Sequence, residues 1–329
     1  MPALRLAKLV TFASITMSLS WPICGAAMAV ERDDPAPMRT ALHIPWAVGG
    51  LRTEANGSTA EHPGEWPSPP VQAVRLWDTR TAWLNLEPAQ DQWDFAQLDA
   101  HLAKARANGV DHVTLVLWGT PRWSAQDTAL TDAPWLGPGS AAPPSDLTDW
   151  VDYVHTVADR YRGQIDAYQI GNEPNLEMFW RGTNAELIQL VVSAAECIKA
   201  TDPLATVVGP PFLFTQSKQL RRAIPLWHEL AVSTTAIDAW SLHWYPAPGA
   251  AASDLARVIA GAPKPIWLTE VGLPDHGQSA KQQVRDLLAT KTAAHRAGVT
   301  YLAWYAWTDL GPRGLIDLLS PRNLRAVLG

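Results

Sequence analysis

The chain has 329 residues, of which 47% are hydrophobic and 18% charged, so it can bury a large core and is not disordered. Its formal net charge is −6, and no block of lysine or arginine points to a nucleic-acid partner. Its two cysteines exclude a disulfide framework and a cysteine-rich zinc module. The 17 tryptophans against 5 phenylalanines favour carbohydrate binding, because an indole face packs on a sugar ring, although tryptophan also fills cores.

The N-terminus has the pattern of a secretory signal peptide over residues 1–29. Arg5 and Lys8, with no acidic residue beside them, precede an apolar stretch from Leu9 to Trp21. Ala27-Met28-Ala29 then provides the small residues of a cleavage site. The apolar stretch is shorter than the about 20 residues that span a bilayer. We therefore expect a periplasmic or extracellular monomer without a membrane span after cleavage, in which residues 30–39 form a linker.

Strand-like and helix-like segments alternate from residue 40 to the end. The predicted strands are Thr40–Val48, Val71–Asp78, Asp111–Trp118, Ile165–Gly171, Thr206–Pro210, Ile237–Tyr245, Pro265–Val271 and Val299–Trp307. The predicted amphipathic helices are Phe95–Asn108, Ser145–Tyr161, Asn184–Lys199, Ser217–Leu230, Ser253–Ala260 and Lys281–Ala297. This alternation implies a parallel sheet, and eight units predict a single-domain (β/α)8 barrel over residues 40–329.

An open, doubly wound sheet is the alternative fold. It is disfavoured because Gly49-Gly50-Leu51-Arg52, after the first strand, lacks the glycine pattern of a phosphate-binding turn. The first βα unit is irregular, since Leu51–Pro70 has no helical period and is predicted to be a long loop. A second insertion, Gly119–Pro144, follows the third strand. In a barrel both insertions lie at the C-terminal mouth, and the short tail after the last strand leaves no room for a second domain.

Two of the predicted strands end in glutamates. Asn172-Glu173-Pro174 closes the fourth strand, and Glu270 ends the seventh. Charged groups rarely end buried strands unless they are paired or functional. Because parallel strands of a barrel end at the same mouth, the two carboxyl groups are expected to converge there. Two converging carboxyl groups fit glycoside hydrolysis, in which one protonates the leaving oxygen and the other attacks the anomeric carbon or activates water.

The sequence resembles glycoside hydrolases of clan A, and family 39 and its relatives, including enzymes acting on exopolysaccharides, are most similar. Besides the two glutamates, the matching segments are Val74-Arg75-Leu76-Trp77-Asp78 with Trp83, Leu86-Glu87-Pro88, Gly119-Thr120-Pro121-Arg122-Trp123, His243-Trp244-Tyr245 and Trp304-Tyr305-Ala306-Trp307. The resemblance implies that Glu173 is the acid/base and Glu270 the nucleophile. The chain departs from many family members because no β-sandwich follows the barrel and the first helix is missing, which leaves the substrate open.

Four further polar residues are expected to support the two glutamates. Arg75 lies in a buried strand and needs a carboxylate partner. The resemblance points to Glu270, and the alternative is a structural pair with Asp78 or another acid. His243 and Tyr245 share one face of the sixth strand, so both can point inward, and in the resembling enzymes the tyrosine bonds to the nucleophile. The resemblance also implies that Asn172 binds the sugar 2-hydroxyl. The alternative is a purely structural role, in which Asn172 caps the turn.

Several tryptophans follow strand ends and are candidate sugar platforms or packing residues: Trp77, Trp118, Trp123, Trp180 and Trp307. Glu87, Glu177 and Asp309 are interpreted as solvated loop acids near the mouth. The nine histidines lack the H-x-H and H-E-x-x-H spacings, so neither a metal nor another cofactor is expected.

The leading functional hypothesis is a secreted, retaining glycoside hydrolase that cleaves a β-linked poly- or oligosaccharide by double displacement. Retention predicts carboxyl groups about 5–5.5 Å apart, a pKa of Glu173 raised by burial and by the Glu270 charge, and a Glu270 kept ionised by Arg75 and Tyr245. Two alternatives remain open: a transglycosylase on the same scaffold, and a catalytically silent barrel that binds polysaccharide.

Overall fold

The computed structural model describes most of the barrel. The described residues are 37–45, 47–48, 50–53, 59–62, 64, 66–67, 71–129, 136–214, 217–245, 252–260, 262, 264–272, 279–306 and 327–328. All of them belong to the compact unit Pro35–Gly329. The predicted signal peptide over residues 1–29 lies outside them, and the predicted linker is described only from residue 37. Every helix in the described part of the chain is too short or too polar to cross a membrane.

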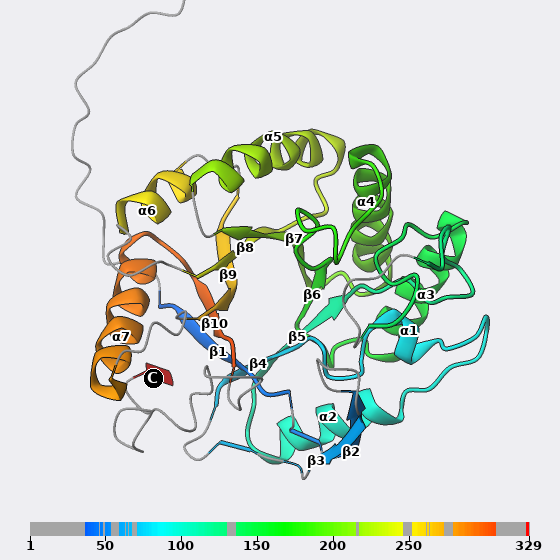
Figure 1. Ribbon diagram of the computed structural model, residues 1–329, viewed down its shortest axis with the longest axis horizontal. Coiled ribbons are helices and arrows are strands. Elements are labelled where there is room, and N and C mark those ends of the chain that lie inside the picture. Colours follow the sequence, from blue (N-terminus) through cyan, green and yellow to red (C-terminus); the bar gives the residue numbers. More distant parts are fainter. Residues whose placement is uncertain are drawn as a thin grey trace, which may run out of the picture. The chain divides into compact units, whose positions relative to one another are not determined.

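Eight parallel strands close into a barrel, as predicted (Figure 1). They are β1 (Arg39–His43), β4 (Ala73–Leu76), β5 (His112–Leu117), β6 (Ala167–Ile170), β7 (Thr206–Phe214), β8 (Ala239–Trp244), β9 (Ile266–Val271) and β10 (Tyr301–Trp304). The ring closes where β1 pairs with both β10 and β4. Each predicted strand overlaps one of these eight, so the (β/α)8 interpretation is confirmed.

Helices surround the strands in Figure 1 and complete the βα units. They are α2 (Ala96–Ala107), α3 (Leu147–Arg160), α4 (Asn184–Thr201), α5 (Ser217–Ser233), α6 (Ala252–Ala260) and α7 (Ala280–Arg296). Side chains cap several N-termini. Thr183 and Glu186 form a capping box on α4, and the side chains of Asp146 and Ser279 accept backbone N–H groups of α3 and α7. The short helix α1 (Trp83–Leu86) was not predicted.

The segment after β1 differs from its prediction as a loop. Two four-residue strands, β2 (Gly50–Thr53) and β3 (Thr59–His62), pair there in an antiparallel ladder. The reason is that backbone N–H and C=O groups need partners even where the side chains show no period, and a hairpin supplies them. The expectation that no helix follows the first strand holds for the described residues between β1 and β4.

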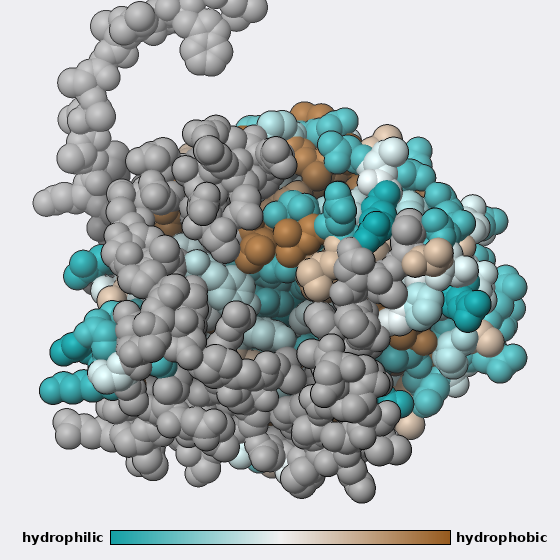
Figure 2. Space-filling model, in the orientation of Figure 1, coloured by the Kyte–Doolittle hydropathy of each residue, from teal (hydrophilic) through white to brown (hydrophobic). Residues whose placement is uncertain are grey.

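Alternation along the strands separates two kinds of buried residue. Val74 and Leu76 of β4 belong to the large hydrophobic cluster that the helices share, whereas Ala73 contributes to a small cluster with Ala41, Ala303 and Tyr301. Arg75, between the first two, is fully buried and has the opposite orientation to its apolar neighbours. Seen from the side drawn in Figure 2, a hollow over the strands has hydrophilic side chains on its floor.

Candidate active site

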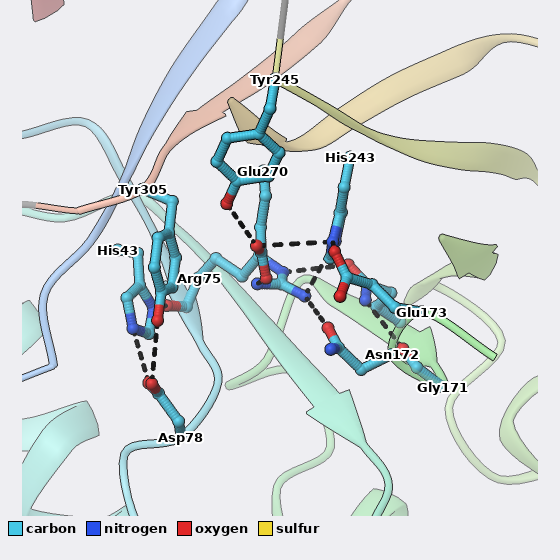
Figure 3. Close-up of polar contacts among 11 residues, drawn as sticks. His43, Arg75, Asp78, Gly171, Asn172, Glu173, His243, Tyr245, Glu270 and Tyr305 are labelled. Atoms are coloured by element: carbon cyan, nitrogen blue, oxygen red, sulfur yellow. Dashed lines mark hydrogen bonds and ion pairs between the residues drawn. The ribbon is translucent and has the colours of Figure 1, made fainter. Parts of the chain in front are cut away.

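The two predicted catalytic glutamates lie at the C-terminal ends of their strands. Glu270 is the fifth residue of β9, and Glu173 follows β6 through a tight turn (Figure 3). Gly171 in that turn has φ +91° and Glu173 has φ +42°, so both have left-handed backbones. A Cβ at position 171 would lie 3.3 Å from the Trp118 ring, which favours glycine there. This turn aims the Glu173 side chain back toward Glu270.

Arg75 holds the centre of the site. Its Nη1 donates to Oε1 of Glu270 at 2.7 Å, and its Nη2 donates to Oδ1 of Asn172 at 3.0 Å. Its Nε donates to Oε1 of Gln169 at 3.0 Å, and the Gln169 amide in turn donates to the carbonyl of Gly171. The guanidinium is therefore paired, as a buried charge requires. Glu270 is its carboxylate partner, as the resemblance implied, and Asp78 is not.

Tyr245 provides the second hydrogen bond to Glu270. Its hydroxyl donates to Oε2 at 2.8 Å, while Arg75 holds the other carboxylate oxygen. Burial is the largest cause that raises the pKa of Tyr245 well above its ordinary value, and the Glu270 charge adds to it, so the hydroxyl stays a donor. Both hydrogen bonds favour the carboxylate form of Glu270, the form that a nucleophile needs.

His243, on β8, lies between the two glutamates. Its Nδ1 is 2.8 Å from Oε1 of Glu173 and 3.4 Å from Oε2 of Glu270, while its Nε2 is 3.4 Å from Nη2 of Arg75. The ring is fully buried. Burial lowers the pKa of His243 to about 3, with the Glu270 charge acting against this and the Arg75 charge adding to it. The imidazole is therefore neutral at ordinary pH.

Glu173 has the electrostatics of a proton donor. Burial raises its pKa to about 7, and the nearby Arg75 charge partly opposes the rise. The predicted rise in the pKa of Glu173 and burial as its cause are confirmed, whereas the Glu270 charge, also predicted to raise it, is not among the causes. A carboxylic acid that keeps its proton near neutrality, beside a second carboxylate that is ion-paired, is the arrangement expected for an acid and a nucleophile.

The two carboxyl groups lie close together. One oxygen of Glu173, one oxygen of Glu270 and one ring nitrogen of His243 all lie within 4.8 Å of one another. The two carboxylate oxygens are therefore at most 4.8 Å apart. Three such atoms could in principle hold a metal ion. However, the Arg75 guanidinium is bonded to Glu270 and faces His243, and its fixed positive charge opposes a cation at this position.

A polar cluster that sequence reasoning missed lies beside Arg75 (Figure 3). Nε2 of His43 is 2.6 Å from Oδ1 of Asp78, and Nδ1 of His43 donates to the backbone carbonyl of Arg75 at 3.0 Å. The Tyr305 hydroxyl donates to the other oxygen of Asp78 at 3.1 Å. The Tyr305 ring stacks on the His43 ring, with the two centroids 4.8 Å apart. The available signal was His43, which ends the first strand directly after the buried apolar residues Ala41 and Leu42.

The tryptophans near the mouth mostly pack against other rings. Trp118 and Trp180 lie 5.4 Å apart, are only 2% and 6% exposed, and each donates its indole N–H to a backbone carbonyl. Trp77 is 5% exposed, with its ring against Phe179. These positions favour the packing interpretation over sugar platforms. Half-buried Trp123 donates to the carbonyl of Glu87, and Trp307 lies outside the described residues.

Glu87 was interpreted as a solvated acid, and this is wrong. Its side chain is 4% exposed and accepts hydrogen bonds from the indole of Trp83 at 2.8 Å and the backbone N–H of Asp91 at 3.0 Å. Burial raises its pKa despite both hydrogen bonds. The short helix α1 brings Trp83 and Glu87 together at i and i+4, a contact that depended on a helix the sequence did not reveal. Glu177 is exposed, as expected, and Asp309 is outside the described residues.

Comparison with protein families identifies the chain. The family described as glycosyl hydrolase catalytic core matches residues 149–314, half of the chain, and this segment includes both glutamates, His243 and Tyr245. The chain belongs to this family. It is therefore a glycoside hydrolase whose substrate is a carbohydrate. No curated protein matches the chain at a significant level.

Solved glycosidases share the fold of this glycoside hydrolase. Xylanase XynB from Paenibacillus barcinonensis is 16% identical with a TM-score of 0.59, over 78% of this chain and 88% of that one. A family 39 β-xylosidase from Caulobacter crescentus is 19% identical with a TM-score of 0.61, over 78% and 63%. A family 39 enzyme from Xanthomonas axonopodis pv. citri is 17% identical with a TM-score of 0.60, over 85% and 64%.

These structures confirm the resemblance to clan A and family 39 at the level of fold. The glycoside hydrolase spans less than two thirds of the length of the two family 39 enzymes, and most of the length of the xylanase.

Proposed function

We propose that this glycoside hydrolase cleaves a β-linked poly- or oligosaccharide with retention of configuration. The observation that carries the proposal is the pair of carboxyl groups: one oxygen of Glu173 and one of Glu270 lie within 4.8 Å of each other, and Glu270 is ion-paired to Arg75. Retaining enzymes hold their carboxyl groups about 5–5.5 Å apart, whereas inverting enzymes need roughly 6.5–9.5 Å to admit a water. The short separation supports direct attack by Glu270.

The first displacement uses the two glutamates in opposite protonation states. The Glu270 carboxylate bonds to the anomeric carbon while the glycosidic C–O bond breaks, and the proton of Glu173 passes to the leaving oxygen. In the second displacement a water attacks the anomeric carbon, gives its proton to Glu173 and releases Glu270. The pKa of Glu173, raised to about 7 by burial, suits both tasks, because the group can hold and return a proton near neutral pH.

Asn172 is the candidate ligand for a hydroxyl of the reacting sugar. Its Oδ1 already accepts from Arg75, so the amide orientation is fixed and its Nδ2 is the atom left to donate. Arg75 thereby orients the nucleophile and the sugar-binding amide together. A hydrogen bond to the sugar that strengthens as charge develops on the ring would add to the stabilisation of the transition state.

The test is a panel of β-linked aryl glycosides and polysaccharides, beginning with β-xylosides because xylanases are among the structural neighbours. NMR of the first product formed is expected to give the same anomer as the substrate, and an inverted anomer would refute the role of Glu270 as nucleophile. Glu270→Ala is expected to abolish hydrolysis. Glu173→Gln is expected to lose least activity on substrates whose leaving groups need no proton, and an equal loss on every substrate would exclude it as the acid.

Export belongs to the same proposal. It rests on the basic start, the apolar stretch and the Ala27-Met28-Ala29 site within residues 1–29. N-terminal sequencing of the protein recovered from periplasmic and culture fractions is expected to begin at Val30, and recovery only of uncleaved cytoplasmic protein would overturn the proposal. A monomeric state stays a prediction, which light scattering can check.

A further inference from the structure

We propose that His243 donates one N–H alternately to Glu173 and Glu270, following the negative charge as it moves between them during the two displacements. The inference rests on the proposed function and adds a positioning role for His243. Three contacts carry it: 2.8 Å from Nδ1 to Glu173, 3.4 Å from Nδ1 to Glu270, and 3.4 Å from Nε2 to Arg75 (Figure 3).

The Arg75 contact fixes which nitrogen carries the hydrogen. A guanidinium has donors only, so the Nε2 that faces its Nη2 has to present a lone pair. The hydrogen therefore sits on Nδ1, on the side of the two glutamates. The low pKa of the ring, about 3 because of burial, agrees with a neutral imidazole that has a single N–H.

Two carboxyl groups lie near this N–H, Glu173 at hydrogen-bond distance and Glu270 at 3.4 Å, and their charges exchange during the reaction. Before the first displacement Glu270 is ionised and Glu173 holds the acid proton. Afterwards Glu270 is an ester and Glu173 is the carboxylate, and the second displacement reverses both states. Because a hydrogen bond to an ionised acceptor is roughly twice as strong as a neutral one, the N–H gains most from whichever glutamate is charged. A donor that is already placed between them needs little rearrangement as the charge moves.

The distances indicate which glutamate depends more on His243. Glu270 also accepts from Arg75 and Tyr245, whereas His243 is the described side chain that donates to Glu173. Since that bond takes Oε1 of Glu173, the acid proton is assigned to Oε2, the oxygen left free to face the glycosidic bond. Loss of the Nδ1 donor should therefore change the titration of Glu173.

Two substitutions separate the ring nitrogens. Asparagine places its amide nitrogen where Nδ1 lies, so His243→Asn keeps the donor to Glu173. Glutamine reaches the Nε2 position, so His243→Gln loses that donor. Without it the ionised form of Glu173 is less stable, and the basic limb of the pH profile of kcat/KM should move up by about one pH unit in His243→Gln. In His243→Asn the limb should stay where it is in the wild type, near pH 7.

The outcome of this comparison is decisive for folded variants. A basic limb at the same pH in His243→Gln and the wild type would overturn the proposal, because a purely structural role would lower the rate without moving the limb. Absence of any Glu270-dependent hydrolysis by the wild type would instead refute the proposed function. The substrate in both cases is the aryl β-glycoside that the panel shows to be cleaved fastest.

Neutron diffraction from deuterated crystals of the wild-type enzyme tests the same point without a variant. We expect a deuteron on Nδ1 of His243, directed at Glu173, and none on Nε2. In crystals that hold the glycosyl-enzyme, trapped with the 2-deoxy-2-fluoro glycosyl fluoride of the cleaved sugar, the Nδ1–Glu173 distance should shorten relative to Nδ1–Glu270. A deuteron on Nε2, or unchanged distances in the trapped enzyme, would overturn the proposal.

Discussion

At the C-terminal ends of the strands, buried Arg75 donates a charge-assisted hydrogen bond to Glu270 and lies at hydrogen-bond distance from His243. At the N-terminal ends, by contrast, aromatic rings fill the barrel. Trp267 stacks on Tyr301 with ring centroids 4.3 Å apart, and His112 packs against both. Burial lowers the pKa of His112 to about 4, so its ring is neutral and acts as one more packing group.

The difference shows what buried polarity does in this fold. The small residues Ala41, Ala73 and Ala303 make room for Tyr301, whose hydroxyl lies 3.1 Å from the Thr114 hydroxyl, so this end is filled by packing. The other end keeps ions that an apolar core would replace without loss of stability. The charges at the C-terminal ends therefore serve the reaction, whereas the rings at the N-terminal ends serve packing. Substitutions at one end at a time test this difference.

The largest effect is expected for Arg75→Met. Removing one partner of a buried ion pair leaves Glu270 uncompensated, which should lower the free energy of unfolding by about 3–5 kcal/mol. Hydrolysis should fall on the order of 10²–10³-fold, because Glu270 and Asn172 both lose the group that orients them. Chemical denaturation and kcat/KM measure the two effects. Wild-type kinetics in this variant would mean that the pair is only structural.

Glu173→Gln should stabilise the protein above neutral pH. The folded pKa of Glu173, about 7, is raised from 4.5, so its contribution to stability is full below pH 4.5 and is lost as the pH rises through 7. Glutamine keeps the side-chain shape without the buried charge. The variant should therefore gain about 3 kcal/mol over the wild type at pH 8 and little at pH 4. Urea unfolding at both pH values is the measurement, and an equal difference at both would contradict the raised pKa.

Trp267→Leu is the matching change at the aromatic end. It removes the ring that stacks on Tyr301 and should cost about 2 kcal/mol of unfolding free energy. The pH profile of hydrolysis should keep its shape, since no ionisable group of the site is altered. A shift of either limb of the pH profile would show that the two ends of the barrel are coupled, and would contradict a purely packing role for the aromatic end.

The smallest effect is expected for Arg39→Ala. Arg39 and Asp111 form an ion pair at 2.5 Å at the N-terminal end of the barrel, but their side chains are 38% and 67% exposed. Solvent screening limits such a pair to below about 1 kcal/mol. Thermal unfolding at low and high salt should give nearly the same midpoint for variant and wild type, whereas a loss comparable with that of Arg75→Met would contradict this.

The sequence was sufficient to predict the barrel and much of the site because the signals were local. Alternation of strands and helices marked the eight units, and parity along β8 placed His243 and Tyr245 on one face. Arg75 in an apolar strand required a buried carboxylate partner. None of these inferences depended on how a loop folds.

The errors came from segments whose structure depends on distant contacts. For Trp118 and Trp180 the sequence left sugar binding and packing open, and the contact between their rings, 5.4 Å apart, favours packing. Glu87 is buried because α1 brings Trp83 over it, and the hairpin of β2 and β3 forms from residues without a clear strand pattern. The cluster of His43, Asp78 and Tyr305 joins three strand ends that are far apart in the sequence.

The turn that carries Glu173 has a consequence for anyone who wishes to move this chemistry into another scaffold. The left-handed backbones of Gly171 and Glu173 set the direction of the acid, and Trp118 and Pro210 lie within 3.4 Å of where a Cβ on residue 171 would stand. A graft of the side chains alone would reproduce the chemical groups but aim the carboxyl group elsewhere. The smallest transferable unit therefore includes the turn and the ring beneath it, and a recipient barrel has to accept both.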